Sequence, residues 1–321
     1  MLFSAAFKAK ARAALQQHWQ TALLIALIVN LPTLLVQGIA SFTNNDVIIR
    51  MEDLLLRASG NAAAMNALPE SVQAMLSEPG IITMTALSVL AWLLTPVLSV
   101  GMNHWTLERL RGQSLPVTAV FSRIRIFLKS VGLRLFIVLK VLLWALPGIA
   151  VFLLSMIPLY RADPQSTASV TSAANLSIHL VYLSMIAMLV LGVMGYLYYA
   201  MADFILADEP EERVLSCARR SKMMMKGRRS VLMSLMLSFL LWYLLVILVT
   251  SFIEGIAGSI AALVLQMLGS LFISVYMLAS EGVFYESLRN APLTAEAAPV
   301  NDLNALDDPD SPDGTDGDEL E

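Results

Sequence analysis

Six apolar stretches, each about 20 residues long or longer, limit the possible folds of this chain more than any other feature. They cover residues 21–42, 81–100, 135–160, 178–202, 231–253 and 256–279. About 20 helical residues, at 1.5 Å each, cross the hydrocarbon core of a bilayer, and a helix satisfies its own backbone hydrogen bonds there. The stretches are continuous rather than alternating, which excludes a transmembrane β-barrel. We therefore predict an all-α, polytopic membrane bundle of six transmembrane helices.

The composition agrees with a membrane protein and excludes several other classes. Apolar residues make up 57% of the chain and charged residues 14%, whereas soluble domains average about 45–50% and 25%. This balance excludes an ordinary cytosolic enzyme and a nucleic-acid-binding protein. The lone Cys217 cannot form an intrachain disulfide, and the three histidines lack metal-ligand spacing. We therefore expect no metal site, no cofactor and no catalytic residues.

The two ends of the chain differ from the apolar body. Residues 291–321 contain ten Asp and Glu residues and no Lys or Arg, so this segment should be a disordered acidic tail following a membrane domain at 1–290. The cations Lys8, Lys10 and Arg12 resemble the start of a signal peptide. The apolar stretch after them exceeds the usual 7–15 residues, which favours an uncleaved first helix.

The distribution of Lys and Arg between the connections predicts the orientation. Seventeen of these residues flank the spans on one side, against Arg50, Arg57 and Arg161 on the other. Cytoplasmic loops carry the excess of positive charge, so both termini are expected in the cytoplasm.

Two of the basic connections are predicted to form amphipathic helices at the cytoplasmic interface. Residues 117–131 place apolar side chains on one helical face, and residues 214–225 form a second apolar stripe. Asp208 and Glu211 resemble a capping box that starts the second helix. Such helices either lie among anionic lipid headgroups or pack as a lid on the bundle. The basic residues expected to face lipid or a partner are Arg123, Arg125, Lys129, Arg219, Lys222, Lys226 and Arg228.

Polar residues within the spans are few. Asn30 lies two residues before Pro32, and Gln266 lies in the last span. A broken helix can expose its backbone to a substrate or an ion, but such residues more often stabilise a kinked helix internally. Convergence of His104, Asp203 and Glu281 on one pocket would instead indicate a lipid-headgroup enzyme.

Several motifs resemble one family of bacterial integral membrane proteins, domain-of-unknown-function family 975. The resemblance covers about residues 1–290, departs from the family in a longer third outer region and an added acidic tail, and is most specific from Phe204 to Trp242. The motifs that carry it are Pro96–Gly112, Phe121, Leu146–Ile149, Tyr199–Pro210, Ser221–Gly227, Leu237–Trp242, Phe284–Tyr285 and Leu288. The resemblance implies a multi-pass protein of the bacterial cytoplasmic membrane and transfers no catalytic residue, because the family has no established activity.

We therefore expect a non-enzymatic membrane protein with a scaffold, assembly or regulatory role at the cell envelope. Its expected partners are the bilayer, anionic phospholipid headgroups and a membrane or cytoplasmic protein, but no nucleic acid. The alternative is a transporter or channel for a small solute or lipid, and a membrane enzyme ranks third.

Overall fold

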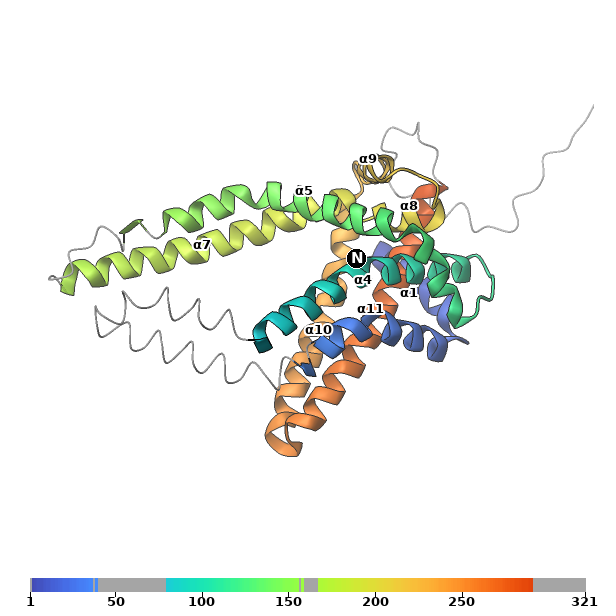
Figure 1. Cartoon of the computed structure of the whole chain (residues 1–321), viewed down its shortest axis with the longest axis horizontal. Coiled ribbons are helices and arrows are strands. Elements are labelled where there is room, and N and C mark those ends of the chain that lie inside the picture. Colours follow the sequence, from blue (N-terminus) through green and yellow to red (C-terminus); the bar gives the residue numbers. More distant parts are fainter. Residues whose placement is uncertain (1, 37, 40–78, 156, 159–166, 291–321) are drawn as a thin grey trace, which may run out of the picture.

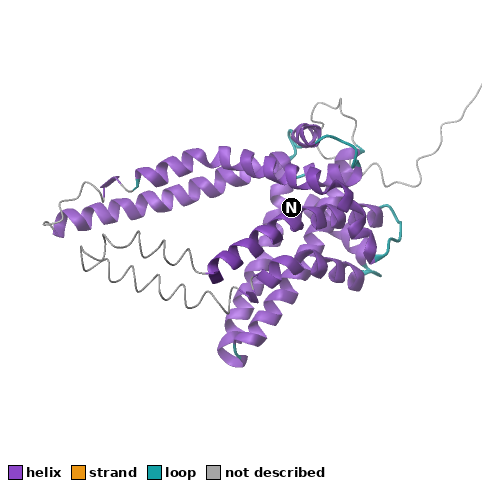
Figure 2. Ribbon diagram, viewed as in Figure 1, coloured by secondary structure: helices purple, strands orange, loops and turns teal. Residues whose placement is uncertain are grey.

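A computed structural model describes residues 2–36, 38–39, 79–155, 157–158 and 167–290. Every regular element in this part of the chain is helical (Figure 2). In chain order the elements are α1 (Leu2–Leu15), the helix Trp19–Val36, α4 (Pro79–Leu110), the 3₁₀ helix η1 (Val117–Ile126), α5 (Phe127–Leu154), α7 (Thr167–Tyr199), α8 (Ala202–Asp208), α9 (Val214–Met224), α10 (Arg229–Ala257) and α11 (Ser259–Arg289). The acidic tail predicted at 291–321 and the ends of the first and third predicted spans lie outside the described residues.

Six of the described helices are long and apolar enough to cross a membrane, which confirms the predicted all-α fold. Two of them continue well past their predicted C-terminal ends. Helix α4 ends at Leu110 rather than Val100, and α11 ends at Arg289 rather than Ala279. Polar residues in these extensions are accommodated by packing. Thr106, for example, is buried and donates a hydrogen bond to Met102 O at 2.8 Å.

The long helices form hairpins that meet at one end of the molecule and diverge from it (Figure 1). Helices α5 and α7 pack along each other, and the approach is close at Gly148, where an added Cβ would lie 2.6 Å from Met188 Cγ. Helices α10 and α11 form a second hairpin, joined at Gly258 with φ of +87°, a backbone conformation that suits glycine.

Most of the buried apolar side chains lie where the hairpins meet. We call this region the charged end; it consists of α1, η1, α8 and α9 with the adjoining ends of the helix Trp19–Val36, α4, α5, α7, α10 and α11 (Figure 1). Its large, fully buried side chains include Trp105, Leu133, Ile205, Leu206, Met225 and Tyr285. Away from it, the α5–α7 arm (138–154 and 175–194) and the α10–α11 arm (240–257 and 259–272) expose most of their apolar side chains.

The first predicted interface helix differs from expectation. Residues 117–126 form a 3₁₀ helix that leads directly into α5, rather than one α-helix over 117–131. The cause is a very close approach to α4, because a Cβ added at Gly101 would lie 2.0 Å from Val120 O. Side chains three residues apart in a 3₁₀ helix point the same way. Val120 is therefore buried against α4, while Phe121 and Ile124 remain exposed on the opposite side.

Candidate functional site

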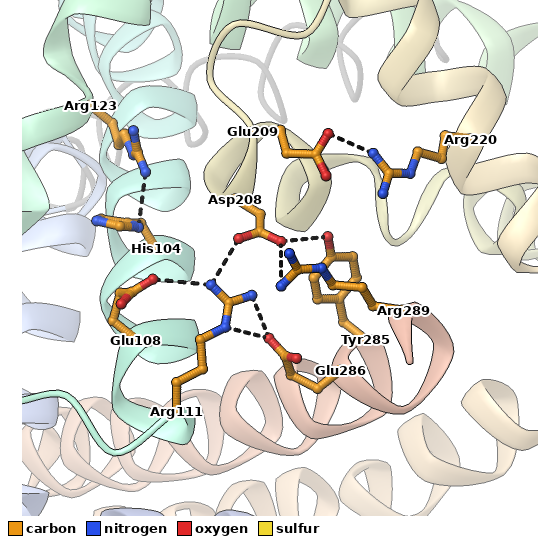
Figure 3. Close-up of polar contacts among 10 residues, drawn as sticks. All are labelled: His104, Glu108, Arg111, Arg123, Asp208, Glu209, Arg220, Tyr285, Glu286 and Arg289. Atoms are coloured by element: carbon orange, nitrogen blue, oxygen red, sulfur yellow. Dashed lines mark hydrogen bonds and ion pairs between the residues drawn. The ribbon is translucent and has the colours of Figure 1, made fainter. Parts of the chain in front are cut away.

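The polar residues of the charged end form an ion-pair network centred on Arg111, which directly follows α4 (Figure 3). Its guanidinium donates hydrogen bonds from Nη1 to Glu108 Oε1 at 3.1 Å and to Asp208 Oδ1 at 2.8 Å. Nη2 and Nε donate to Glu286 Oε1 at 2.6 and 2.9 Å. One side chain thus connects the ends of α4, α8 and α11. The hydrogen bond with Asp208 is the main cause that raises the pKa of Arg111 above its ordinary value.

Asp208 is the second centre of this network. Its side chain is only 7% exposed, and its Oδ2 accepts a hydrogen bond from the Tyr285 hydroxyl at 3.2 Å and an ion pair from Arg289 Nη1 at 3.3 Å. We call Glu108, Arg111, Asp208, Glu286 and Arg289 the five-residue network. Three carboxylates and two guanidinium groups nearly balance in charge, as a partly buried cluster requires.

The assignment of Asp208 as the cap of the second interface helix is wrong. Asp208 ends α8, whereas α9 begins at Val214 after an Arg213 cap that makes no side-chain hydrogen bond. The carboxylate instead binds Arg111 and Arg289, which come from distant parts of the chain, through charge-assisted bonds. Local spacing therefore misidentified the partner of this residue.

Two further contacts connect η1 and α5 to the same end. Arg123 Nη2 lies 3.0 Å from His104 Nδ1, and because arginine only donates, this imidazole nitrogen is the acceptor. Lys129 Nζ donates to Pro210 O at 2.8 Å, which holds the connection between α8 and α9 against α5. Arg123 and Lys129, predicted to face lipid, are thus engaged within the protein, whereas Arg125 is exposed.

Helix α9 presents a different surface. Its inner face buries Cys217, Ala218, Ser221 and Met224, and Ser221 donates a hydrogen bond to Tyr198 O at 3.1 Å. Burial is the main cause that raises the pKa of the Cys217 thiol to about 11. Five side chains are exposed on or just after this helix, namely Leu215, Arg219, Lys222, Met223 and Lys226. Three predicted basic positions therefore share an accessible face with two apolar side chains, and Arg228 lies half-buried beside them.

The mid-span polar residues have hydrogen-bond partners within the bundle. The Asn30 amide donates to Ala26 O at 2.8 Å, one turn before it and close to Pro32. Gln266 Oε1 accepts a hydrogen bond from the Thr250 hydroxyl at 2.8 Å, which joins α10 to α11.

Of the three residues whose convergence would indicate an enzyme, Asp203 and Glu281 lie close enough to interact electrostatically, whereas His104 has different neighbours. His104 contacts Arg123, and Asp203 lies 3.6 Å from Arg134. Glu281 is buried in α11, and its Oε1 has no hydrogen-bond partner among the described residues. Within the described ranges, no three His, Cys, Asp or Glu residues lie close enough together to hold a metal ion.

The five-residue network was missed by sequence reasoning, although its members have a common signal. Each lies near the end of a predicted span on the side that carries most of the Lys and Arg residues. That signal places them at one membrane face, but it does not pair Arg111 with residues 97 and 175 positions away.

One known family covers all of the chain before the acidic segment 291–321. Residues 1–292 match the model of the family described as "Protein of unknown function (DUF975)". The chain belongs to this family. The resemblance seen in the motifs is thereby confirmed. No curated protein and no solved structure matches the chain.

Proposed function

We propose that this member of the family is a non-enzymatic protein of the bacterial cytoplasmic membrane with a scaffold, assembly or regulatory role at the cell envelope. Its charged end faces the cytoplasm and binds anionic lipid headgroups or a partner protein. The observation that carries this proposal is the face of exposed side chains on and just after α9, where Arg219, Lys222 and Lys226 lie beside Leu215 and Met223. Cations beside apolar side chains are typical of surfaces that lie among headgroups.

The exposed side of η1 supports the same location. Phe121 and Ile124 are exposed there beside Arg125, and Leu128 at the start of α5 is also accessible. Moving apolar side chains of this size from water to the acyl boundary of a bilayer lowers the free energy.

The hydrogen bonds of Asn30 and Gln266 favour this role over transport, because their polar groups bind neighbouring atoms of the bundle. Ion-pair geometry favours it over catalysis, since the carboxylates near Arg111 are held by guanidinium groups rather than aimed at a substrate space.

The orientation is tested by reporter fusions in the full chain. Fusions after Gly112 and Gly227 should report a cytoplasmic position, and fusions after Gly60 and Ala173 an external one. A consistent inversion at any of the four positions contradicts the six-span orientation.

The α9 surface is tested with the full-length protein in a neutral detergent, titrated with phosphatidylglycerol or phosphatidylcholine. Replacing Arg219, Lys222, Lys226 and Arg228 by Gln should weaken phosphatidylglycerol binding by about five-fold per charge, which corresponds to about 1 kcal/mol. The matched control, Arg219→Lys with Arg228→Lys, keeps the charge and should bind as the wild type does. Equal binding by the neutral variant at low salt rejects the lipid role of α9.

A further inference from the structure

An apolar groove runs along the α10–α11 hairpin beside the helix Trp19–Val36, away from the α9 surface. It has a volume of about 630 Å³. Phe239 and Val249 line it on α10, and Leu265 and Tyr276 line it on α11, while Arg12 lies at its border. None of the residues that line this groove is acidic.

The length of the groove matches one leaflet of a bilayer. From Leu265 to Tyr276 the α11 backbone rises about 16 Å, at 1.5 Å per residue. The hydrocarbon core is about 30 Å thick, so the groove extends through about half of it. An apolar groove of this length fits one extended acyl chain.

Two cations lie where the groove meets the charged end. Arg12 stands over the Tyr276 ring, with 5.9 Å between its guanidinium carbon and the ring centroid, and Lys8 Nζ lies 4.3 Å from the Phe239 ring centroid. Tyr276 also donates a hydrogen bond to Lys8 O at 3.1 Å, which fixes α1 to α11 at this point. Within the described part of the chain, neither cation forms an ion pair with a carboxylate.

The environment of Lys8 favours a bound anion. Burial lowers the pKa of this ammonium below its ordinary value, because the charged form loses water without gaining a carboxylate. A phosphate beside Lys8 and Arg12 would restore the missing opposite charge. An anionic headgroup and an acyl chain are the two parts of one phospholipid molecule, and the groove offers a complementary surface to each.

We propose that the groove binds one anionic phospholipid, with an acyl chain between α10 and α11 and the headgroup phosphate at Lys8 and Arg12. This inference depends on the proposed membrane location, but it uses none of the cations of α9 or η1. The bound lipid would connect α1 to the α10–α11 hairpin as a structural ligand.

Native mass spectrometry of the full chain in mild detergent tests the site with phosphatidylglycerol and phosphatidylcholine of equal chain length. The wild type should retain one phosphatidylglycerol in preference to phosphatidylcholine. Lys8→Gln with Arg12→Gln should reduce that preference by about five-fold per cation. The matched control is Lys10→Gln, which removes a charge from the same helix outside the groove and should retain the lipid.

Filling the groove gives a second, independent test. Val249→Trp should weaken retention of phosphatidylglycerol, whereas Leu248→Trp should not, because Leu248 is 69% exposed and does not line the groove. Glycerol phosphate, which has a headgroup but no acyl chain, should not displace the lipid. Circular dichroism and size-exclusion profiles identify any variant that is misfolded.

Several outcomes overturn the proposal. These are unchanged retention in the double Gln variant, equal losses in the two Trp variants, displacement by glycerol phosphate, and a protein dimer without lipid, which would mean that a second copy occupies the groove. The neutral α9 variant should keep this single lipid. If the neutral α9 variant binds phosphatidylglycerol as the wild type does, while the double Gln variant loses the groove lipid, the proposed function of α9 is rejected and the groove proposal stands.

Discussion

The charged end and the two apolar arms are built on different principles. At the charged end, side chains from many helical elements, including the helix Trp19–Val36, are buried against one another, and a polar network connects residues distant in sequence. In the arms, by contrast, apolar side chains point outward, as Leu189 of α7 and Leu248 of α10 do. The specific contacts of the fold are therefore concentrated at the charged end.

A bilayer explains this difference. Lipid tails solvate leucine about as well as other leucines do, so arms in a membrane gain little by burying apolar surface. In the orientation that we propose, the charged end projects toward headgroups and water, where apolar burial and ion pairing both stabilise a structure. Substitutions should therefore have larger effects at the charged end than in the arms.

Removing the centre of the polar network should have the largest effect. Asp208→Ala removes the almost fully buried carboxylate that accepts bonds from Arg111, Arg289 and Tyr285. Because these charge-assisted bonds are lost together, we expect a loss of about 4 kcal/mol in the free energy of unfolding. The control is Glu209→Gln, because the Glu209–Arg220 pair is about one-third exposed and should contribute about 0–1 kcal/mol. Thermal unfolding in detergent, followed by tryptophan fluorescence, measures both. Equal effects would mean that the network is not a stabilising centre.

Truncating one leucine in each region should give the next largest difference. Leu206 is fully buried in α8, so Leu206→Ala should cost about 3 kcal/mol, through lost contacts and a cavity. Leu189 is 67% exposed in the α5–α7 arm, so Leu189→Ala should change the free energy of unfolding by about 0.5 kcal/mol or less. The same unfolding assay compares them. A large loss for Leu189→Ala would show that the arm is packed against protein.

Adding a methyl group at one glycine in each region should give a smaller difference in the free energy of unfolding. Gly101→Ala directs a Cβ onto the backbone of Val120, so we expect a destabilisation of about 2 kcal/mol. Gly192→Ala in the α5–α7 arm brings its Cβ no nearer than 3.9 Å to Val141, an ordinary contact, and should be neutral or slightly stabilising. If Gly101→Ala is as stable as the wild type, η1 does not lie against α4 as described.

The smallest expected effect is chemical rather than energetic. The Cys217 thiol is buried, with its pKa raised to about 11, so very little reactive thiolate exists at pH 7.5. Maleimide labelling of the native protein should be slow and should become fast in denaturant. A cysteine introduced by Arg219→Cys on the exposed face of α9 should react rapidly and serves as the positive control. Rapid native labelling of Cys217 would show that α9 is not packed on the bundle.

The sequence predicted the arms better than the charged end, for a physical reason. A span reveals itself in 20 consecutive residues, because the bilayer imposes one length and one polarity along the chain. Of the partners of Arg111, only Glu108 is a neighbour in sequence. Asp208 and Glu286 lie in separate elements, and nothing local to Arg111 specifies them. The Asp208 motif shows the same limit, since its spacing fitted a helix cap while its charge was used by distant arginines.

The interface segments show an intermediate case. Periodicity predicted one apolar face over residues 117–131, but the structure divides it, with Val120 buried and Phe121 and Ile124 exposed. The periodicity could not predict how closely Val120 approaches α4 at Gly101. At this contact, residues 117–126 form a 3₁₀ helix instead of the expected α-helix. For α9 the exposed cations follow from helical spacing alone, and three of the predicted positions are accessible there.

We infer that the arms lie in lipid while the charged end lies at an aqueous interface. Spin labels at positions 189, 248 and 219, in a Cys217→Ala background reconstituted in bilayers, test it through their collision rates with oxygen and with a water-soluble nickel complex. Positions 189 and 248 should be accessible to oxygen and protected from nickel, and position 219 should show the reverse. Equal access of nickel to positions 189, 248 and 219 would mean that the arms do not lie in lipid.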